Sequence, residues 1–395
     1  MNFNSLEFLT DHCKSILKFY EPIVIDPEGG FFQNFYDNGA VFDPDFRQLV
    51  SSTRIIFNYA TAGRFFNRSD YLDRARHGLV YMEHAHWQEK NQSYAWLLRQ
   101  HRPVDMTQQA YGYAFVLLAY AACRKAGIVD SNESLLKTYD LLEQRFWLKD
   151  KGVYADEISA EGVLSDYRGQ NSNMHLCEAM IAAFEASGEQ QFITRAQQLA
   201  ESIAFQQADK TGGLVWEHFT PDFEIDWDYN RDDPKNLYRP WGFQPGHQAE
   251  WAKLLLSLNR HVPDSRYVDR ARSLFDQAWT IAWDDQYGGL IYGFNPEKQW
   301  CDEEKYFWVQ AESFAAAAML AEVTGEDHYW QQYEQLWQYC WDHFVDHEYG
   351  AWFRVLSRDN QKTSNEKSSA GAKCDYHTLG ACFEVLRVKG VTSAD

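Results

Sequence analysis

Apolar residues recur at the i, i+3, i+4 spacing of amphipathic helices along most of this chain. The pattern predicts twelve helices, because each segment carries such a stripe over at least thirteen residues. Their ranges are 5–20, 47–67, 70–87, 107–126, 133–147, 171–187, 190–206, 246–260, 265–282, 306–324, 327–344 and 372–388. The chain is therefore expected to be all-α in its main elements.

A second and shorter pattern separates the predicted helix pairs. A turn with Gly or a small polar residue is followed by an alternating run that is rich in aromatic residues. The six copies are Gly29-Gly30-FFQNF, Ser93-YAWLL, Gly152-VYADE, Gly212-Gly213-LVWEHF, Gly288-Gly289-LIYGF and Gly350-AWFRVL. Alternation with a period of two after a turn residue predicts a short strand or hairpin in each copy.

Six helix pairs in one chain pack either as an open solenoid or as a closed ring. The last helix, within SAGAKCDYHTLGACFEVLRV, is apolar and rich in small residues, so it is expected to be buried and not to form a polar cap. Closure into a single (α/α)6 barrel domain over residues 1–395 is favoured. The even-numbered helices are rich in Ala, Gly and Ser, which suits an inner ring. The odd-numbered helices carry more charge and suit an outer ring.

Composition narrows the range of partners. The net charge is −20 and aromatic residues make up 16% of the chain. An acidic surface repels nucleic acid and anionic membranes, whereas aromatic rings stack well on sugars, so a small neutral substrate is expected. Seven cysteines without a C-x-x-C pair indicate reduced thiols and a cytoplasmic location. No signal peptide or membrane span is predicted, and the oligomeric state is left open between monomer and homodimer.

The starts of the predicted inner helices carry the candidate chemistry. The selected residues are Arg54, Tyr111, Asn171, Asn173, His175, Arg239, His247, Glu250, Trp308, Glu312, Asp375 and His377. His247 and Glu250 are three residues apart on a helix and share a face, so the carboxylate can orient the imidazole. Each histidine taken alone is more often a core residue. The hypothesis of an active site depends on the whole set lying at the starts of inner helices.

Several other kinds of site are not indicated. The chain has no G-x-G-x-x-G fingerprint, P-loop, G-x-S-x-G or H-E-x-x-H motif. His84 and His86 fall on a predicted outer helix and are expected to be solvated. Acid–base chemistry without a cofactor or metal is what remains. Two alternatives stay open, namely a glycoside hydrolase that uses carboxylates and a sugar-binding scaffold without catalysis. The carboxylates available to a hydrolase are Asp156, Glu217, Glu250 and Glu312.

Three segments, RGQNSNMHLCEA, RPWGFQPGHQAEW and KCDYHTLGACFE, resemble the N-acylglucosamine 2-epimerase family, and the resemblance covers nearly the whole chain. The first segment is similar to the aldose–ketose isomerase branch. This resemblance implies a reversible conversion of D-mannose to D-fructose through a cis-enediolate, with no cofactor. The alternatives within the family are 2-epimerisation of mannose, cellobiose or N-acylglucosamine, and isomerisation of sulfoquinovose.

The same resemblance implies roles for individual residues. His247 and His377 are the expected acid–base pair, with His175 and Glu250 in support. Arg54 and Arg239 are expected to bind substrate hydroxyls, and Trp308 is expected to stack on the sugar. The remaining selected residues are expected to contact the substrate; they are Tyr111, Asn171, Asn173, Glu312 and Asp375.

Overall fold

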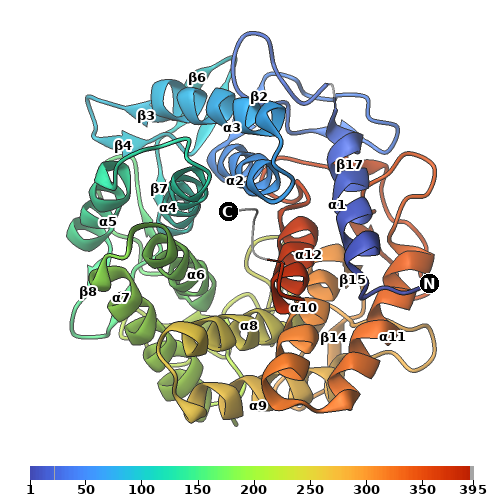
Figure 1. Cartoon of the computed structure of the whole chain (residues 1–395). Helices are drawn as coiled ribbons and strands as arrows, with labels where there is room; N and C mark the ends of the chain where they lie inside the picture. The colour runs from blue at the N-terminus through green and yellow to red at the C-terminus, as the bar shows by residue number, and fades with distance from the viewer. Residues whose placement is uncertain (22, 392–395) are drawn as a thin grey trace. The chain divides into compact units, whose positions relative to one another are not determined.

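The computed structural model describes residues 1–21 and 23–391, and these residues form two compact units. Unit 1 comprises Met1–Phe19, Ala200–Asn365 and His377–Val391, and unit 2 comprises Tyr20–Leu199 and Glu366–Tyr376. Helices dominate both units, whereas the strands are two to four residues long (Figure 1). The mixture of long helices and very short strands agrees with the two sequence patterns.

Unit 2 is built from helical hairpins that follow one another along the chain. Its helices are α2 (Leu49–Phe65), α3 (Ser69–Tyr81), η1 (Met82–His86), α4 (Ala110–Lys125), α5 (Glu133–Arg145), α6 (Gln170–Ser187) and α7 (Gln190–Ala200), the last of which ends one residue inside unit 1. Helix α2 packs against α3 and α4, and α4 packs against α5 and α6 (Figure 1). The alternate helices α2, α4 and α6 thus lie in one row.

Unit 1 repeats this arrangement with the later part of the chain. Its helices are α1 (Leu6–Tyr20), η2 (Glu201–Gln207), α8 (Pro245–His261), α9 (Ser265–Ala282), α10 (Phe307–Thr324), α11 (Asp327–His343) and α12 (Tyr376–Val388), apart from the terminal residues Tyr20 and Tyr376. Helix α8 packs against α9 and α10, and α10 packs against α11 (Figure 1).

The twelve predicted helices are confirmed within the described residues, with three differences. The helices predicted at 70–87 and 190–206 each end in a wider π-helical turn, η1 or η2. The helix predicted at 372–388 begins only at Tyr376. Asp375 has a φ of 52°, a left-handed conformation that a helix does not continue through, so the chain turns there before α12 starts.

The expected difference between helices rich in small residues and helices rich in charged residues is also confirmed. Helix α10 is buried along most of its length and has four consecutive alanines, 315–318, at its centre. Helix α5 buries only Leu135, Thr138 and Leu142 and exposes a charged face. No helix in the described part of the chain combines the length and the apolarity that are needed to span a bilayer.

Each predicted aromatic run contains a short strand or an antiparallel bridge. In unit 2 the strands are β1 (Phe35–Tyr36), β2 (Phe46–Gln48), β3 (Trp87–Gln88), β4 (Ser93–Tyr94), β5 (Leu97–Arg99), β6 (Arg102–Asp105), β7 (Gln108–Gln109), β8 (Trp147–Leu148), β9 (Val153–Tyr154), β10 (Glu157–Ile158), β11 (Arg168–Gly169) and β17 (Glu366–Ser368). In unit 1 they are β12 (His218–Phe219), β13 (Gly293–Phe294), β14 (Trp300–Asp302), β15 (Lys305–Tyr306) and β16 (Val355–Leu356). The antiparallel pairs within the units are β1–β17, β2–β5–β6, β3–β4, β7–β10, β8–β9, β13–β14 and β15–β16.

A side-chain amide in the first turns of three helices fixes the preceding hairpin to the helix that follows it. Each amide oxygen accepts from a backbone N–H, and the amide nitrogen donates to the carbonyl of the same residue. The pairs are Asn173 with Tyr154, Gln248 with Val215, and Gln310 with Leu290. Because all three amides are buried, this clamp sets where each helix begins relative to its hairpin.

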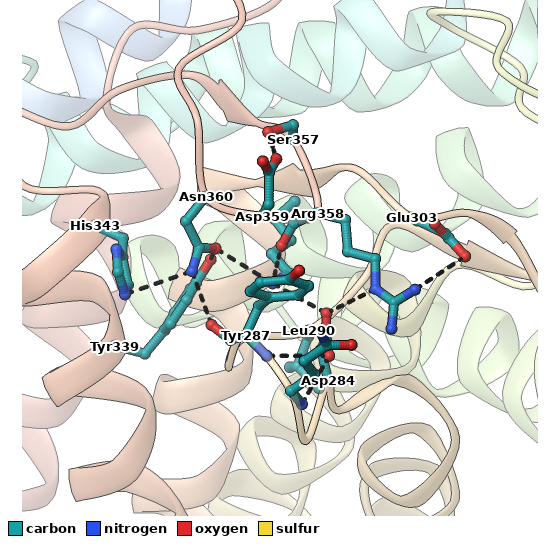
Figure 2. Close-up of polar contacts among 12 residues, drawn as sticks. Asp284, Tyr287, Leu290, Glu303, Tyr339, His343, Ser357, Arg358, Asp359 and Asn360 are labelled. Atoms are coloured by element: carbon teal, nitrogen blue, oxygen red, sulfur yellow. Dashed lines mark hydrogen bonds and ion pairs between the residues drawn. The ribbon is translucent and has the colours of Figure 1, made fainter.

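A buried polar network holds the start of α10 in unit 1 (Figure 2). Asp284 accepts from Nε of Arg358 at 3.1 Å, and Asn360 donates to the carbonyl of Tyr287 at 2.8 Å. The ammonium of Lys305, on β15, donates to the carbonyl of Arg358 and lies 3.3 Å from Asp284. Since Lys305 and Asp284 are almost wholly buried, the network anchors the strand that leads directly into α10.

The seven cysteines are free thiols, as the sequence predicts. Six are buried and Cys301 is half-buried. Burial raises the pKa of the Cys301 thiol to about 11 and the pKa of the Cys123 thiol further still. A thiol in such surroundings stays protonated and unreactive at neutral pH.

Candidate active site

The first functional side chain of unit 1 is His247, in the first turn of α8. The helix begins with Pro245, whose fixed φ suits the first helical position. Nδ1 of His247 donates to the carboxylate of Glu217 and lies 2.9 Å from each of its two oxygens. Both side chains are nearly buried. The carboxylate orients the ring and keeps the proton on Nδ1, which makes Nε2 the nitrogen that takes up or returns a proton.

Another candidate side chain of unit 1 is that of His377, which follows Tyr376 at the start of α12. Its Nδ1 donates to Oε1 of Glu312 on α10 at 2.7 Å. The other oxygen of Glu312 accepts from Nζ of Lys253 on α8 at 2.5 Å. Glu312 is predicted from the sequence to contact substrate, but in the structure its two oxygens bind a histidine and a lysine. Lys253 is not among the residues that the sequence analysis selects.

Trp308 on α10 packs against both histidines. Its ring centroid lies 5.0 Å from that of His247 and 5.7 Å from that of His377, at interplanar angles of 36° and 38°. The indole is half-buried. Gly246 faces the same ring so closely that a Cβ at this position would overlap it. One aromatic ring thus lies against the imidazoles of both His247 and His377, and it needs a glycine beneath it.

Glu250 lies on α8 and is 1% exposed. Potential ligand atoms of Glu250, Glu312 and His377 lie within 4.8 Å of one another. The ammonium of Lys253 already binds the Glu312 carboxylate and offsets part of the negative charge of this cluster. The sequence predicts Glu250 as the carboxylate that supports His247, whereas Nδ1 of His247 binds Glu217.

Arg239 is also in unit 1, in a segment without regular secondary structure before α8. It is half-buried, and its guanidinium donates to the hydroxyl of Tyr229 at 3.2 Å. Asn230 in turn donates to the carbonyl of Arg239 at 2.7 Å. The segment around Arg239 is therefore held by its own polar contacts.

Unit 2 contains a third histidine–carboxylate pair. Nδ1 of His175 on α6 donates to Oε2 of Glu178 at 3.0 Å, one helical turn away. The hydroxyl of Tyr376 donates to Oε1 of the same glutamate at 2.6 Å. His175 also packs against the rings of Tyr111 and Phe115, at centroid distances of 5.1 and 4.9 Å.

Arg54 of α2 is buried in an aromatic cage in unit 2. Its guanidinium carbon lies 4.2 Å from the Phe115 ring centroid and 4.9 Å from that of Tyr376. Nη2 donates to the hydroxyl of Tyr111 at 2.8 Å. Stacking on aromatic rings offsets part of the free energy that the guanidinium loses when burial removes its water. The rings and the Tyr111 hydroxyl thus hold the guanidinium of Arg54 inside unit 2.

Two predicted substrate contacts are buried and bind protein groups. Asn173 is 0% exposed and forms the backbone clamp to Tyr154 described above. Asp375 is also 0% exposed, and its Oδ2 accepts from Nζ of Lys373 at 2.5 Å and from the hydroxyl of Tyr20 at 2.6 Å. Asn171, by contrast, is half-buried in the first turn of α6.

The prediction for His86 is wrong, although His84 is exposed as expected. His86 is 0% exposed because η1 turns it inward. One ring nitrogen lies 3.0 Å from Oγ of Ser52 and the other 2.9 Å from the carbonyl of Ala95. Burial lowers the pKa of His86 to about 4, so the ring is neutral and structural.

Comparison with known proteins places these helical hairpins and carboxylate-held imidazoles in a family of sugar isomerases and epimerases. The chain belongs to the N-acylglucosamine 2-epimerase family, whose sequence model matches residues 30–381. The resemblance inferred from the three motifs is thereby confirmed.

Within this family the chain is most usefully compared with D-mannose isomerases. The D-mannose isomerase of Marinomonas mediterranea is 50% identical over 387 residues, which cover 98% of each chain. The enzyme of the same name from Thermobifida fusca is 36% identical over 256 residues, which cover 64% of this chain and 63% of the relative.

Solved structures support the fold class. A crystal structure of a D-mannose isomerase has a TM-score of 0.96 and 49% identity, and covers 98% of this chain and 99% of its own. Cellobiose 2-epimerase from Bacillus thermoamylovorans B4167 has a TM-score of 0.83 at 19% identity, with 97% and 100% coverage, and this likeness concerns the fold alone. The chain has the fold class predicted from its sequence, the all-α (α/α)6 barrel with short β-hairpins.

Proposed function

We propose that this protein is an aldose–ketose isomerase that interconverts D-mannose and D-fructose. The observation that carries the proposal is the pair of imidazoles in unit 1, His247 and His377, each with its Nδ1 bound to a buried glutamate and both in contact with Trp308. The 50% identity to a D-mannose isomerase over nearly the whole chain supports this choice of substrate.

The reaction requires a proton to move between neighbouring carbons. The sugar ring first opens, which needs a proton on the ring oxygen. A base then removes the proton from C2 to give a cis-enediolate. The C1 oxygen takes up a proton, the C2 hydroxyl gives one up, and the carbon proton, or one from solvent, is returned to C1 to give the ketose. We assign the transfer between C2 and C1 to Nε2 of His377. We assign ring opening and protonation of the enediolate oxygen to His247, and the two roles are open to exchange.

The glutamates act on this chemistry through the histidines. Glu217 and Glu312 each hold a ring in one tautomer and one orientation, which spares the transition state the cost of ordering it. In unit 2, Glu178 does the same for His175. Trp308 offers an apolar face to the carbon skeleton of a sugar, and its half-buried indole supports that role.

The other predicted residues fall into two groups. Substrate binding remains our proposal for Arg54 and Arg239, as the family resemblance implies, and for Tyr111 and Asn171, because of their places at the starts of helices. For Asn173 and Asp375 the buried contacts favour positioning roles, because Asn173 clamps a hairpin and Asp375 fixes the turn before α12. Glu250 remains our candidate for a supporting carboxylate.

Further parts of the proposal concern the protein as a whole. We propose a single catalytic domain, because the family match at 30–381 includes parts of both units. Independence from a cofactor or metal, a cytoplasmic location and a monomeric or homodimeric state stay predictions. Activity after exhaustive treatment with chelator, compared with activity after addition of divalent metal, tests the first of these.

The deciding experiment is a proton NMR time course of metal-stripped protein with D-mannose in D2O. Appearance of fructose with deuterium at C1, together with deuterium at C2 of mannose through the reverse reaction, is the expected result. Formation of glucose alone would contradict the isomerase and indicate a 2-epimerase, the activity named for the relatives at about 21% identity. Unchanged mannose would contradict the substrate, and cellobiose, N-acylmannosamine and sulfoquinovose would then be tested.

A further inference from the structure

We propose that Lys253 is a positioning residue that holds Glu312 in its charged form and thereby sets the pH at which the Glu312–His377 pair gives up its proton. The proposal deepens the proposed function, on which its kinetic part rests, because it concerns the group that we assign to the transfer between C2 and C1.

The contacts show why Lys253 acts on the histidine without touching the reacting atoms. Nζ of Lys253 binds Oε2 of Glu312 at 2.5 Å, and Nδ1 of His377 binds Oε1 at 2.7 Å. Each carboxylate oxygen thus has its own cationic or N–H partner. The side chain of Lys253 is 11% exposed and that of Glu312 is 1% exposed, so water screens neither interaction strongly.

Lys253 lies on α8, the helix that also carries His247 and Glu250. Lys253 is three residues after Glu250 and six after His247, so the three side chains lie within about two turns of one helix. A buried lysine that pairs with a catalytic carboxylate is costly to desolvate. It is retained here at a glutamate that also holds a histidine, which points to a role in proton transfer beyond packing.

The direction of the effect follows from electrostatics. An ammonium and an imidazolium on the same carboxylate repel each other, so Lys253 favours the state in which His377 is neutral. Glu250 is a further charged group that faces the pair, and its carboxylate favours the protonated state, whereas Trp308 and Phe307 contribute uncharged rings. Without the ammonium, two carboxylates would remain around the imidazole, and the pair would retain its proton to a higher pH.

The test combines variants with a titration that needs no substrate. Protein labelled with ¹³C at histidine is titrated by NMR, and the His377 ring signal is identified by its loss in His377→Gln. We expect Lys253→Met to raise the titration midpoint of this signal by about one pH unit or more. Lys253→Arg, which keeps the charge, should return the midpoint to within about 0.3 of the wild-type value. Lys125→Met, which breaks the separate ion pair with Glu185, serves as the control and should leave it unchanged.

The kinetic readout distinguishes the two proposals. The acidic limb of the pH profile of kcat/KM for mannose should move to higher pH in Lys253→Met by the same amount as the NMR midpoint, with a smaller change in KM than in kcat. Should Lys253→Met fail to fold by circular dichroism, Lys253→Gln replaces it. A folded neutral variant with an unmoved His377 midpoint overturns the role of Lys253. Wild-type protein that titrates as expected but leaves mannose unchanged overturns only the substrate.

Discussion

Replacing Glu217 by glutamine is the sharpest test of the histidine assignment, because it alters one charge and almost no volume. In the wild type, Nδ1 of His247 donates to a carboxylate with both oxygens 2.9 Å away. A hydrogen bond to a charged group contributes about 1.5–3 kcal/mol, which corresponds to roughly 10- to 10²-fold in rate. The glutamine can also turn its NH2 group toward Nδ1. The ring proton then moves to Nε2, the wrong tautomer for catalysis, and such an inversion costs up to about 10⁴-fold.

We therefore expect Glu217→Gln to lower kcat by about 10²–10⁴-fold while the protein stays folded. The measurement is the initial rate of fructose formation at saturating mannose, with the melting temperature as the check on folding. Glu224→Gln is the matched control, because Glu224 is in the same segment but is 70% exposed and pairs only with Lys210 in a surface contact. A folded Glu217→Gln protein that keeps more than a third of the wild-type kcat would refute the role of this pair.

Three other perturbations test separate parts of the structure. Gly246→Ala should lower kcat about 10–10²-fold by displacing Trp308, and a crystal structure with the indole unmoved would contradict this. Arg54→Lys keeps the charge but loses the planar stacking on Phe115, so kcat/KM should fall about tenfold, and an unchanged value would exclude a role for the cage. Because burial lowers the pKa of His86 to about 4, the stability that its neutral ring contributes is complete above about pH 6.5 and is lost as the pH falls toward 4, by about 3 kcal/mol. His86→Gln should reduce this loss in urea unfolding at pH 7 and pH 5, and an equal loss in both proteins would contradict the assignment.

The helices were predictable because each is a local pattern. Helical spacing locates α4 and α10 closely, since their apolar residues continue on all sides and their ends carry turn residues. The late start of α12 was not predictable in this way. Asp375 takes a left-handed φ that its buried contacts with Lys373 and Tyr20 stabilise, and one of these partners lies 355 residues away in the sequence. No local pattern contains that information.

The histidines could be selected from the sequence, but their partners could not. An i,i+3 spacing favours Glu250 as the partner of His247, and the same spacing does pair His175 with Glu178. Nδ1 of His247 is hydrogen-bonded to Glu217, 30 residues away in the sequence, and Nδ1 of His377 to Glu312, 65 residues away. A spacing rule for one helix finds only partners on that helix. Glu217 and Glu312 instead reach the histidine rings from other segments of unit 1.

The same geometry explains how two similar histidines can work at one pH as an acid and a base. Glu217 directs both of its oxygens at Nδ1 of His247, an arrangement that fixes the orientation and the tautomer of this ring. Glu312 divides its oxygens between His377 and the ammonium of Lys253, which suits a ring that is neutral and accepts a proton from carbon. The proposed mechanism needs a neutral imidazole to accept the carbon proton, and the ammonium of Lys253 beside Glu312 favours that form of His377. This asymmetry favours His377 for the transfer between C2 and C1 and His247 for ring opening.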